Sequence, residues 1–361
     1  MKQAIKWAAG IVAALLVLLV TLVWLTTFHP ATLQAAPVAC AQATPMLQPG
    51  QSLKLMTWNV QFMAGKNYVF FSDLPTGTAP DERPSRADIT KTLGEVARVI
   101  RAERPDLVLL QEVDDGAART DYENQLARLT ALLPPEYACQ TEAFYWKAAY
   151  VPHPRIHGAV GMKLAILSRY QIRSAQRHQL ALMAGDLLSQ QFNLKRAILE
   201  ADLPVAGEHD FVALDTHLDA FAQGNDTMEQ QVGQVDALLA SLTSAGMPWA
   251  IGGDFNLLPS EQAYRELIAS HQSFYNPHTE IAPLYAHYQA MPSYTETTGP
   301  DAQRWYTYFP NDPAVGRPDR TLDYLFFAPN VQPGQHYVRQ HDTLAISDHL
   351  PIVAEFRLPP R

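Results

Sequence analysis

Six short polar clusters combine amide, carboxylate and imidazole side chains, and each adjoins an apolar run. In chain order they are Thr57-Trp58-Asn59-Val60, Gln111-Glu112-Val113, Thr216-His217-Leu218, Gly253-Asp254-Phe255-Asn256, Leu322-Asp323-Tyr324 and Ser347-Asp348-His349. Groups of these types hold a hard cation, contact a phosphate and activate a water molecule. One such cluster would carry little weight, whereas six in order indicate a catalytic site.

The apolar runs before five of the clusters predict buried strands. They cover residues 53–56, 107–110, 211–214, 249–251 and, more weakly, 344–346. Polar groups at strand ends meet at one rim of a sheet, where α/β proteins usually place their active sites. We therefore expect the six clusters to converge.

Helical periodicity predicts three helices, and further apolar runs predict two more strands. The helices cover 87–101, 121–133 and 227–242, and the strands cover 164–167 and 197–203. Because helices and strands do not alternate strictly, the pattern favours antiparallel or mixed sheets packed together, with helices outside.

The N-terminal segment is expected to cross a membrane. Residues 7–28 carry no charge and exceed the roughly 20 residues that span a bilayer. Lys2 and Lys6 precede them, so the positive-inside rule makes 1–6 a cytoplasmic tail and places the rest outside the cytoplasmic membrane, in the periplasm. The alternative is a secreted protein whose signal peptide is cleaved near 33–36, although the apolar stretch is long for that role.

Residues 29–50 carry four prolines and no charge, which predicts an extended tether to a catalytic domain at 51–361. Two cysteines, Cys40 and Cys139, could form a disulfide in an oxidising compartment. They could equally be two unrelated thiols, and the sequence leaves both possibilities open.

The formal net charge of the chain is −9. Without the two positive charges of Lys2 and Lys6, the exported part carries −11. Affinity for nucleic acid rests mostly on basic side chains, so this charge disfavours a nucleic-acid substrate without excluding one.

Taken together, the clusters resemble the endonuclease/exonuclease/phosphatase superfamily with its DNase I-like fold. The resemblance spans Leu53 to Leu358, and residues 161–169 are similar to the central strand motif of that family. It implies an α/β four-layer sandwich with two mixed β-sheets flanked by helices, here joined to an N-terminal transmembrane helix. It also implies Mg²⁺-dependent phosphodiester hydrolysis by water, with Mn²⁺ or Ca²⁺ as alternative cations.

The resemblance places Glu112 as the principal metal ligand, with Asn59 and Asp348 beside it. Asn59 is also expected to contact the substrate phosphate. Read alone, Glu112 is better explained as a surface residue in a helix cap or a loop.

The same resemblance assigns His217 and His349 to the phosphate, Asp254 to the attacking water, and Asn256 to both. Asp323 would support a catalytic histidine or the metal. Read alone, His217 fits a core histidine, and Asp254 with Asn256 fits an Asx turn.

The stretch Thr216-His217-Leu218-Asp219-Ala220 resembles the His-Leu-x-Ala motif of sphingomyelinases and other lipid-directed members. We therefore expect a phosphodiester of a lipid or a related small molecule as substrate, with no obligate protein partner. The alternatives are an exported nuclease and an enzyme that remodels lipid anchors. A non-catalytic binding module is disfavoured, because every expected catalytic position is filled.

Overall fold

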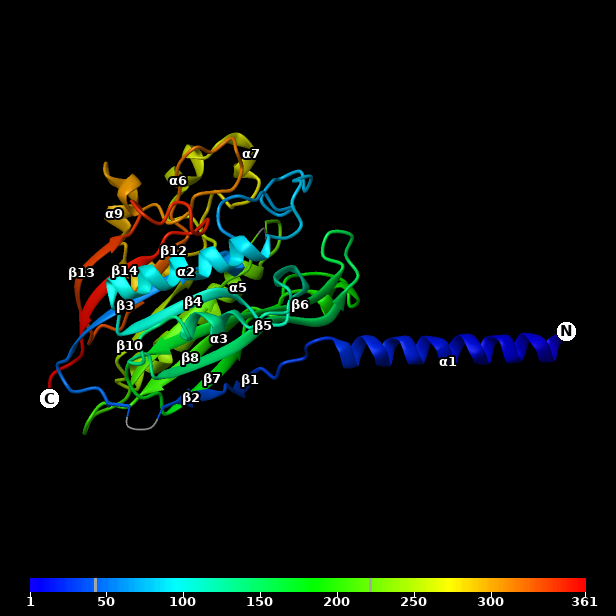
Figure 1. The fold of residues 1–361 in the computed structure, drawn as a ribbon, viewed down its shortest axis with the longest axis horizontal. Coiled ribbons are helices and arrows are strands. Elements are labelled where there is room, and N and C mark those ends of the chain that lie inside the picture. Colours follow the sequence, from blue (N-terminus) through cyan, green and yellow to red (C-terminus); the bar gives the residue numbers. More distant parts are fainter. Residues whose placement is uncertain (42–43, 221–222) are drawn as a thin grey trace.

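In the computed structural model, which describes residues 1–41, 44–220 and 223–361, the strands form two seven-stranded mixed sheets (Figure 1). The first sheet has the order β13 (Gln332–Val338), β14 (Ile352–Arg357), β3 (Ser52–Asn59), β4 (Leu107–Asp114), β6 (Gly158–Ser168), β5 (Cys139–Val151), β2 (Val38–Cys40). The second has the order β1 (Leu33–Ala35), β7 (Ser174–Gln179), β8 (Ala197–Leu203), β9 (Phe211–His217), β10 (Trp249–Asp254), β12 (Asp323–Phe327), β11 (Gln289–Met291).

Helices cover the outer faces of both sheets. The first sheet is covered by α2 (Arg86–Glu103) and α3 (Gln125–Thr130), and the second by α5 (Thr227–Ser244) and α8 (Ala282–His287). The remaining short helices lie in connections: η1 (Gln61–Met63), η2 (Ala118–Thr120), α4 (Ser189–Phe192), α6 (Glu261–Glu266), α7 (Ala269–Gln272), α9 (Tyr294–Thr298) and η3 (Ala302–Trp305).

Apolar side chains from both sheets interlock between them. Leu55 and Leu109 of the first sheet and Leu214 and Ile251 of the second are fully buried in one shared core. This burial of apolar area is the main favourable contribution to folding. The expected sandwich of two mixed sheets flanked by helices is therefore confirmed.

Each sheet contains one parallel strand pair joined through a helix. β3 and β4 are parallel with α2 between them in the chain, and β9 and β10 are parallel with α5 between them. Parallel neighbours need such a crossover, and their carboxyl ends lie at the same edge. Because the two sheets pack face to face, both edges contribute to one rim of the sandwich.

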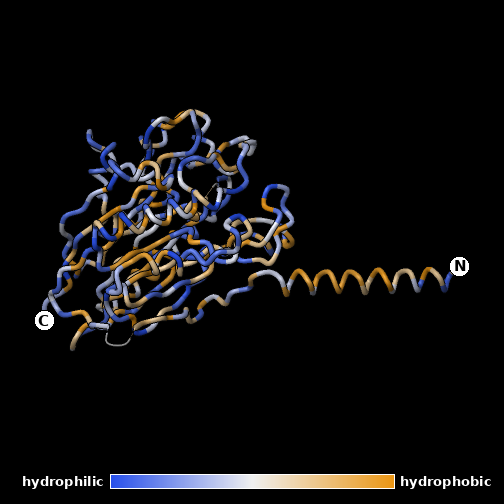
Figure 2. The backbone as a smooth tube through the Cα atoms, viewed as in Figure 1, coloured by the Kyte–Doolittle hydropathy of each residue, from blue (hydrophilic) through white to orange (hydrophobic). Residues whose placement is uncertain are grey.

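The N-terminal helix α1 (Lys2–Thr26) projects away from the domain and has no buried residue (Figure 1). Its apolar residues form one continuous stretch along the tube (Figure 2). Within the described residues it is the one helix long and apolar enough to cross a membrane.

The segment 29–50 is not the free tether that the sequence suggested. β1 pairs with β7, β2 pairs with β5, and Leu47 is fully buried. The segment is extended and uncharged, so its backbone can hydrogen-bond to the open edges of both sheets. The folded domain thus begins near Leu33 instead of residue 51.

Cys40 and Cys139 are directly opposite each other in the β2–β5 ladder and form a disulfide. The two cysteines are 99 positions apart in the sequence. The disulfide fastens the N-terminal segment to the edge of the first sheet.

Two predicted elements differ from the structure. Residues 344–346 form a turn, in which Ile346 N–H donates to Thr343 O at 2.9 Å, and not a strand. The helix predicted over 121–133 is reduced to α3, because the Asn124 side chain caps a later start by accepting from Ala127 N–H at 2.8 Å.

Candidate active site

The rim of the sandwich brings together the last residues of three strands and the first residue of a fourth. Asn59 ends β3, His217 ends β9 and Asp254 ends β10, while Asp323 begins β12. β12 is antiparallel to β10 and pairs Asp323 with Asp254. Four of the six sequence clusters therefore meet because of the sheet register.

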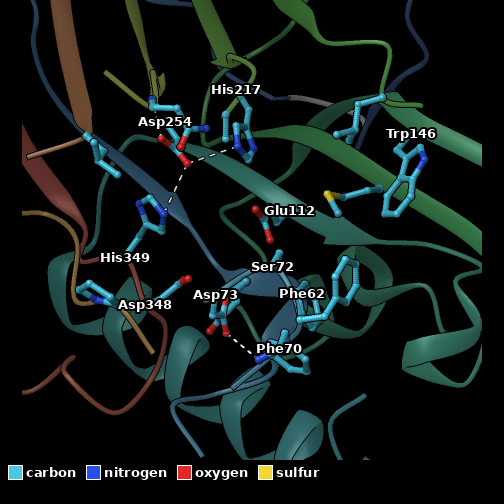
Figure 3. Close-up of a pocket in the computed structure, with 18 of the residues that line it drawn as sticks. Phe62, Phe70, Ser72, Asp73, Glu112, Trp146, His217, Asp254, Asp348 and His349 are labelled. Atoms are coloured by element: carbon cyan, nitrogen blue, oxygen red, sulfur yellow. Dashed lines mark hydrogen bonds and ion pairs between the residues drawn. The ribbon is translucent and has the colours of Figure 1, made fainter. Parts of the chain in front are cut away.

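Asp254 lies at the centre of the site, between two imidazoles (Figure 3). Its Oδ2 is 3.3 Å from His217 Nε2, 3.4 Å from His349 Nε2 and 3.0 Å from Asn59 Nδ2, which donates to it. Burial raises the pKa of Asp254 to about 6, although the positive charge of His349 opposes the shift. A carboxyl group with such a pKa can exchange a proton near neutral pH.

His349 is held between two carboxylates. Its Nδ1 is 2.8 Å from Asp323 Oδ2, on the opposite side of the ring from Asp254. Burial lowers the pKa of His349, but Asp323 and Asp254 outweigh that effect and raise it to about 10. The ring is therefore an imidazolium at neutral pH.

His217 is the neutral counterpart of His349. Burial, followed by the charges of Arg196 and His349, lowers the pKa of His217 well below its usual value. Asp254 is an acceptor, so Nε2 carries the ring proton, and Nδ1 faces the Tyr145 hydroxyl at 3.3 Å. The site thus pairs one charged and one neutral histidine around a single carboxylate.

Glu112 enters the site through a β-bulge. The register of β4 with β6 shifts between Leu110 and Val113, and Glu112 has a φ of 58°. Its Oε1 accepts from Asn59 Nδ2 at 3.2 Å. Burial raises the pKa of Glu112, and the nearby Arg119 opposes the shift. Such bulges commonly re-aim a side chain beside an active site.

Asp348 lines the same cavity as Glu112 (Figure 3). Ser347 positions this segment, because its hydroxyl donates to Asn59 O at 2.8 Å. Burial raises the pKa of Asp348 to about 7; His349 opposes the shift, and the charges of Glu112 and Asp73 add to it.

Two groups of residues could hold a metal ion. Ligand atoms of Asp254, Asp323 and His349 lie within 4.8 Å of one another, but they already face each other in the contacts described above. Glu112 is freer: among the described residues no group donates to its Oε2. The charge of Glu112 also adds to the raised pKa of Asp348. This oxygen-rich set fits a hard divalent ion such as Mg²⁺.

Asn256 forms a turn with Asp254 and also lines the cavity. Its backbone N–H donates to Asp254 Oδ1 at 2.9 Å, which is the Asx turn considered as the alternative to a catalytic role. It lines the cavity with a φ of 53°, and its Nδ2 donates to Leu218 O at 3.1 Å. The turn and the site are therefore the same feature.

Sequence patterns did not reveal Arg196, Lys66, Asp73 and Arg119, which are four of the charged residues that line or border the cavity. Arg196 is buried, donates through Nε to Asp219 Oδ1 at 3.1 Å, and keeps Nη1 without a hydrogen-bond partner among the described residues. Lys66 and Asp73 come from the irregular loop after β3. Burial lowers the pKa of Lys66 to about 8 and raises that of Asp73 to about 6. The fourth, Arg119, is fixed by Asp114.

These residues surround a cavity of about 300 Å³. Glu112, His217, Asp254, Asp348 and His349 form its polar end (Figure 3). A largely apolar wall completes it, with Phe62, Phe70, Trp146, Ile156, Val160, Met162 and Leu194.

A family model described as the Endonuclease/Exonuclease/phosphatase family matches residues 56–349. The chain belongs to this family. Members of the Endonuclease/Exonuclease/phosphatase family are hydrolases that act on phosphoester bonds and commonly depend on a divalent metal. The phosphoesterase class expected from the sequence is therefore confirmed.

Several solved structures are similar to this chain. An endonuclease/exonuclease/phosphatase from Beutenbergia cavernae DSM 12333 is 22% identical, with a TM-score of 0.57, over 86% of this chain and 72% of that one. A family protein from Bacteroides thetaiotaomicron is 14% identical, with a TM-score of 0.51, over 86% and 98%. The human nocturnin catalytic domain with bound sulfate is 17% identical, with a TM-score of 0.49, over 89% and 96%. The first two establish the DNase I-like fold, and a search of the curated proteins gave no match.

Proposed function

We propose that the protein is a divalent-metal-dependent phosphodiesterase, held in the cytoplasmic membrane by α1 with its catalytic domain in the periplasm. Its substrate is a phosphodiester of a lipid or a related small molecule. The observation that carries the proposal is the place of Asp254, which contacts His217, His349 and Asn59 at the polar end of a cavity with an apolar wall.

Glu112, with Asn59 and Asp348, would hold the cation, Mg²⁺ or alternatively Mn²⁺ or Ca²⁺, which when bound would neutralise charge on the phosphate oxygens. Asp254 accepts the proton of the attacking water as the oxygen–phosphorus bond forms. No covalent nucleophile is needed, because the water attacks phosphorus directly while the leaving oxygen departs.

His349 and His217 have different roles in the proposed reaction. His349 presents a positive charge to the phosphate, and Asp323 fixes its ring orientation through Nδ1. Neutral His217 donates through Nε2 to Asp254 Oδ2. Because its ring is neutral, it adds no second positive charge beside Arg196. Donors placed in advance where charge develops are usually the largest contribution to such catalysis. Asn256 orients the water through its position beside Asp254.

A lipid or small-molecule substrate is supported by charge and by the cavity. The exported part carries −11, as derived above from the sequence, which opposes binding of a polyanion. Trp146, Ile156, Val160 and Met162 line the same cavity as the catalytic groups. The runner-up is an exported nuclease, and enzymes that remodel lipid anchors remain a related alternative.

A retained anchor is supported by β1. Signal cleavage near residues 33–36 would cut within or just after β1 and remove an edge strand that pairs with β7. The loss of these backbone hydrogen bonds would expose the edge of the second sheet.

The test is an activity panel on the full chain in nanodiscs, with phospholipids, DNA, RNA and phosphomonoesters under matched Mg²⁺. Low salt is the fair condition, because it favours any nucleic-acid binding. We expect release of phosphorylated head group from lipid to exceed hydrolysis of the other substrates. Efficient cleavage of plasmid DNA with no head-group release would replace this proposal with the nuclease.

A further inference from the structure

Three large apolar side chains are exposed on two neighbouring segments, the end of β5 and the loop before α4. Tyr150 is 51% exposed, Leu187 84% and Leu188 64%. The segments pack together, since Trp146 Nε1 on β5 donates to Phe192 O on α4 at 2.7 Å. Scattered apolar residues are ordinary on a soluble surface, whereas a group of them marks a contact surface.

Leu187 and Leu188 lie in a turn that hydrogen bonds to the Asp186 side chain stabilise. Asp186 Oδ1 accepts from Leu188 N–H at 2.9 Å and Ser189 N–H at 3.0 Å, and its Oδ2 accepts from Ser189 Oγ at 2.6 Å. This arrangement begins α4 and holds Leu187 outward at the tip.

The membrane-compatible helix leaves the domain beside these segments. Thr27 pairs with Ala148 near the end of β5 and Cys40 pairs with Cys139 at its start, while β1 between these two points pairs with β7. α1 therefore departs beyond Ala148, at the end of β5 where the β5–β6 hairpin turns at 152–157. In Figure 1 the green loops of this region lie next to the domain end of α1.

The same two segments form the apolar wall of the active-site cavity. Trp146, Ile156 and Val160 of the β5–β6 hairpin line the cavity, and Leu194 follows α4. Tyr150, Leu187 and Leu188 on the same segments are exposed, while these inner side chains line the cavity together with the catalytic groups.

We propose that Tyr150, Leu187 and Leu188 insert into the headgroup–acyl boundary of the bilayer that α1 enters, and that the cavity draws its substrate from this bilayer. The inference rests on the membrane anchoring proposed above and narrows the substrate class to membrane-embedded phosphodiesters. The bilayer is the occupant because α1 is apolar, has no buried residue and leaves the domain at Thr27, which pairs with Ala148 near the end of β5. Insertion of exposed aromatic and leucine side chains is how peripheral surfaces bind the interface.

The first test needs no activity. Both native cysteines are joined in the disulfide, so Leu187→Cys gives a single free thiol for a fluorescent label. The full chain is placed in phosphatidylcholine–phosphatidylglycerol nanodiscs. We expect a nitroxide on the lipid to quench this label and aqueous iodide to be excluded from it. Leu132→Cys is the matched control, because Leu132 is 43% exposed and adjoins the C-terminal end of α2, at the opposite end of the sheet. Equal iodide quenching at both positions would overturn the proposal.

The second test measures turnover. Replacing both leucines with serine should lower hydrolysis of vesicle phospholipid by about tenfold, as expected for two lost apolar side chains at an interface. Hydrolysis of soluble bis(p-nitrophenyl) phosphate should stay at the wild-type rate, as should both activities of Leu132→Ser. An unchanged vesicle rate in the double variant would refute membrane docking. Absence of all phosphodiester hydrolysis in the wild type would refute the proposed function, while the labelling result would still decide docking.

Discussion

His349 Nε2 lies 3.4 Å from Asp254 Oδ2, while Asp323 holds the opposite nitrogen of the same ring at 2.8 Å. An imidazole between two carboxylates remains charged, and its charge in turn favours the ionised form of Asp254. The water-activating group and the phosphate-binding group are thus electrostatically linked. Changes at Asp323, which lies behind His349, should be felt at Asp254.

Glu112→Gln should abolish activity while leaving the fold intact, because the amide removes the charged ligand at the bulge of β4. Mg²⁺ should raise the Tm of the wild type but not of this variant, which gives a readout besides turnover. Glu261→Gln on exposed α6 is the control and should behave as wild type. Full wild-type turnover in excess chelator would remove the metal from the mechanism.

Asp254→Asn should lower kcat by about a hundredfold or more, since general-base assistance typically contributes about 10²–10⁴. KM should change less, because the amide preserves the shape of the side chain. Steady-state kinetics on a soluble phosphodiester separate the two constants. A near-normal kcat would mean that another group, such as His349, accepts the proton from water.

At acidic pH, the change of kcat/KM with pH should reflect protonation of the Asp254 carboxylate. Burial raises its pKa to about 6, so kcat/KM should fall as the pH drops below about 6 and the carboxylate is protonated. An acid limb near the pKa of an ordinary exposed aspartate would contradict this assignment.

His349 titrates on the alkaline side, with a pKa raised to about 10. A histidine pKa raised on folding contributes stability that is fully present below the unfolded value of about 6.5 and is lost as pH rises through 10. Asp323→Asn should lower the pKa of His349, so the stability that the charged ring contributes should be lost at a lower pH. Histidine NMR titration of the metal-free protein measures the shift, and an unchanged pKa would show that Asp323 does not hold the charge.

Removing the disulfide with Cys40→Ala and Cys139→Ala should lower the free energy of unfolding by about 2–4 kcal/mol, because the bond closes a long loop in the unfolded chain. Urea unfolding of the full chain in detergent measures the change. A loss below the error of the extrapolation would show that the β2–β5 ladder holds the segment without it.

The full chain should fractionate with membranes, and residues after Lys54 should be protease-accessible in spheroplasts. A soluble form beginning near Ala36 would instead establish a cleaved signal peptide. Mass spectrometry of the N-terminus distinguishes the two.

Much of the site could be predicted from sequence because polar residues next to long apolar strands carry a local signal. Asn59 and His217 follow such runs, and the strand register then brings them together. β1 and β2 could not be predicted in this way. Each has three residues, and its extended form depends on the sheet edge that it joins.

Lys66 and Asp73 were missed for a different reason. They lie in an irregular loop that has no periodicity, and they reach the cavity only through tertiary packing against Phe309 O and Asn311. The strand predicted over 344–346 was wrong because short apolar runs fit turns as well as strands.

The edge pairing of β1 and β2 has a consequence for motion. Only residues 27–32 separate α1 from the first strand, and one of them is already paired with β5. At about 3.3 Å per residue, this spacer reaches no more than about 20 Å. With α1 in a membrane, as proposed above, the domain would stay within this distance of the bilayer. Its search for substrate would then be diffusion in two dimensions, governed by surface density within one leaflet.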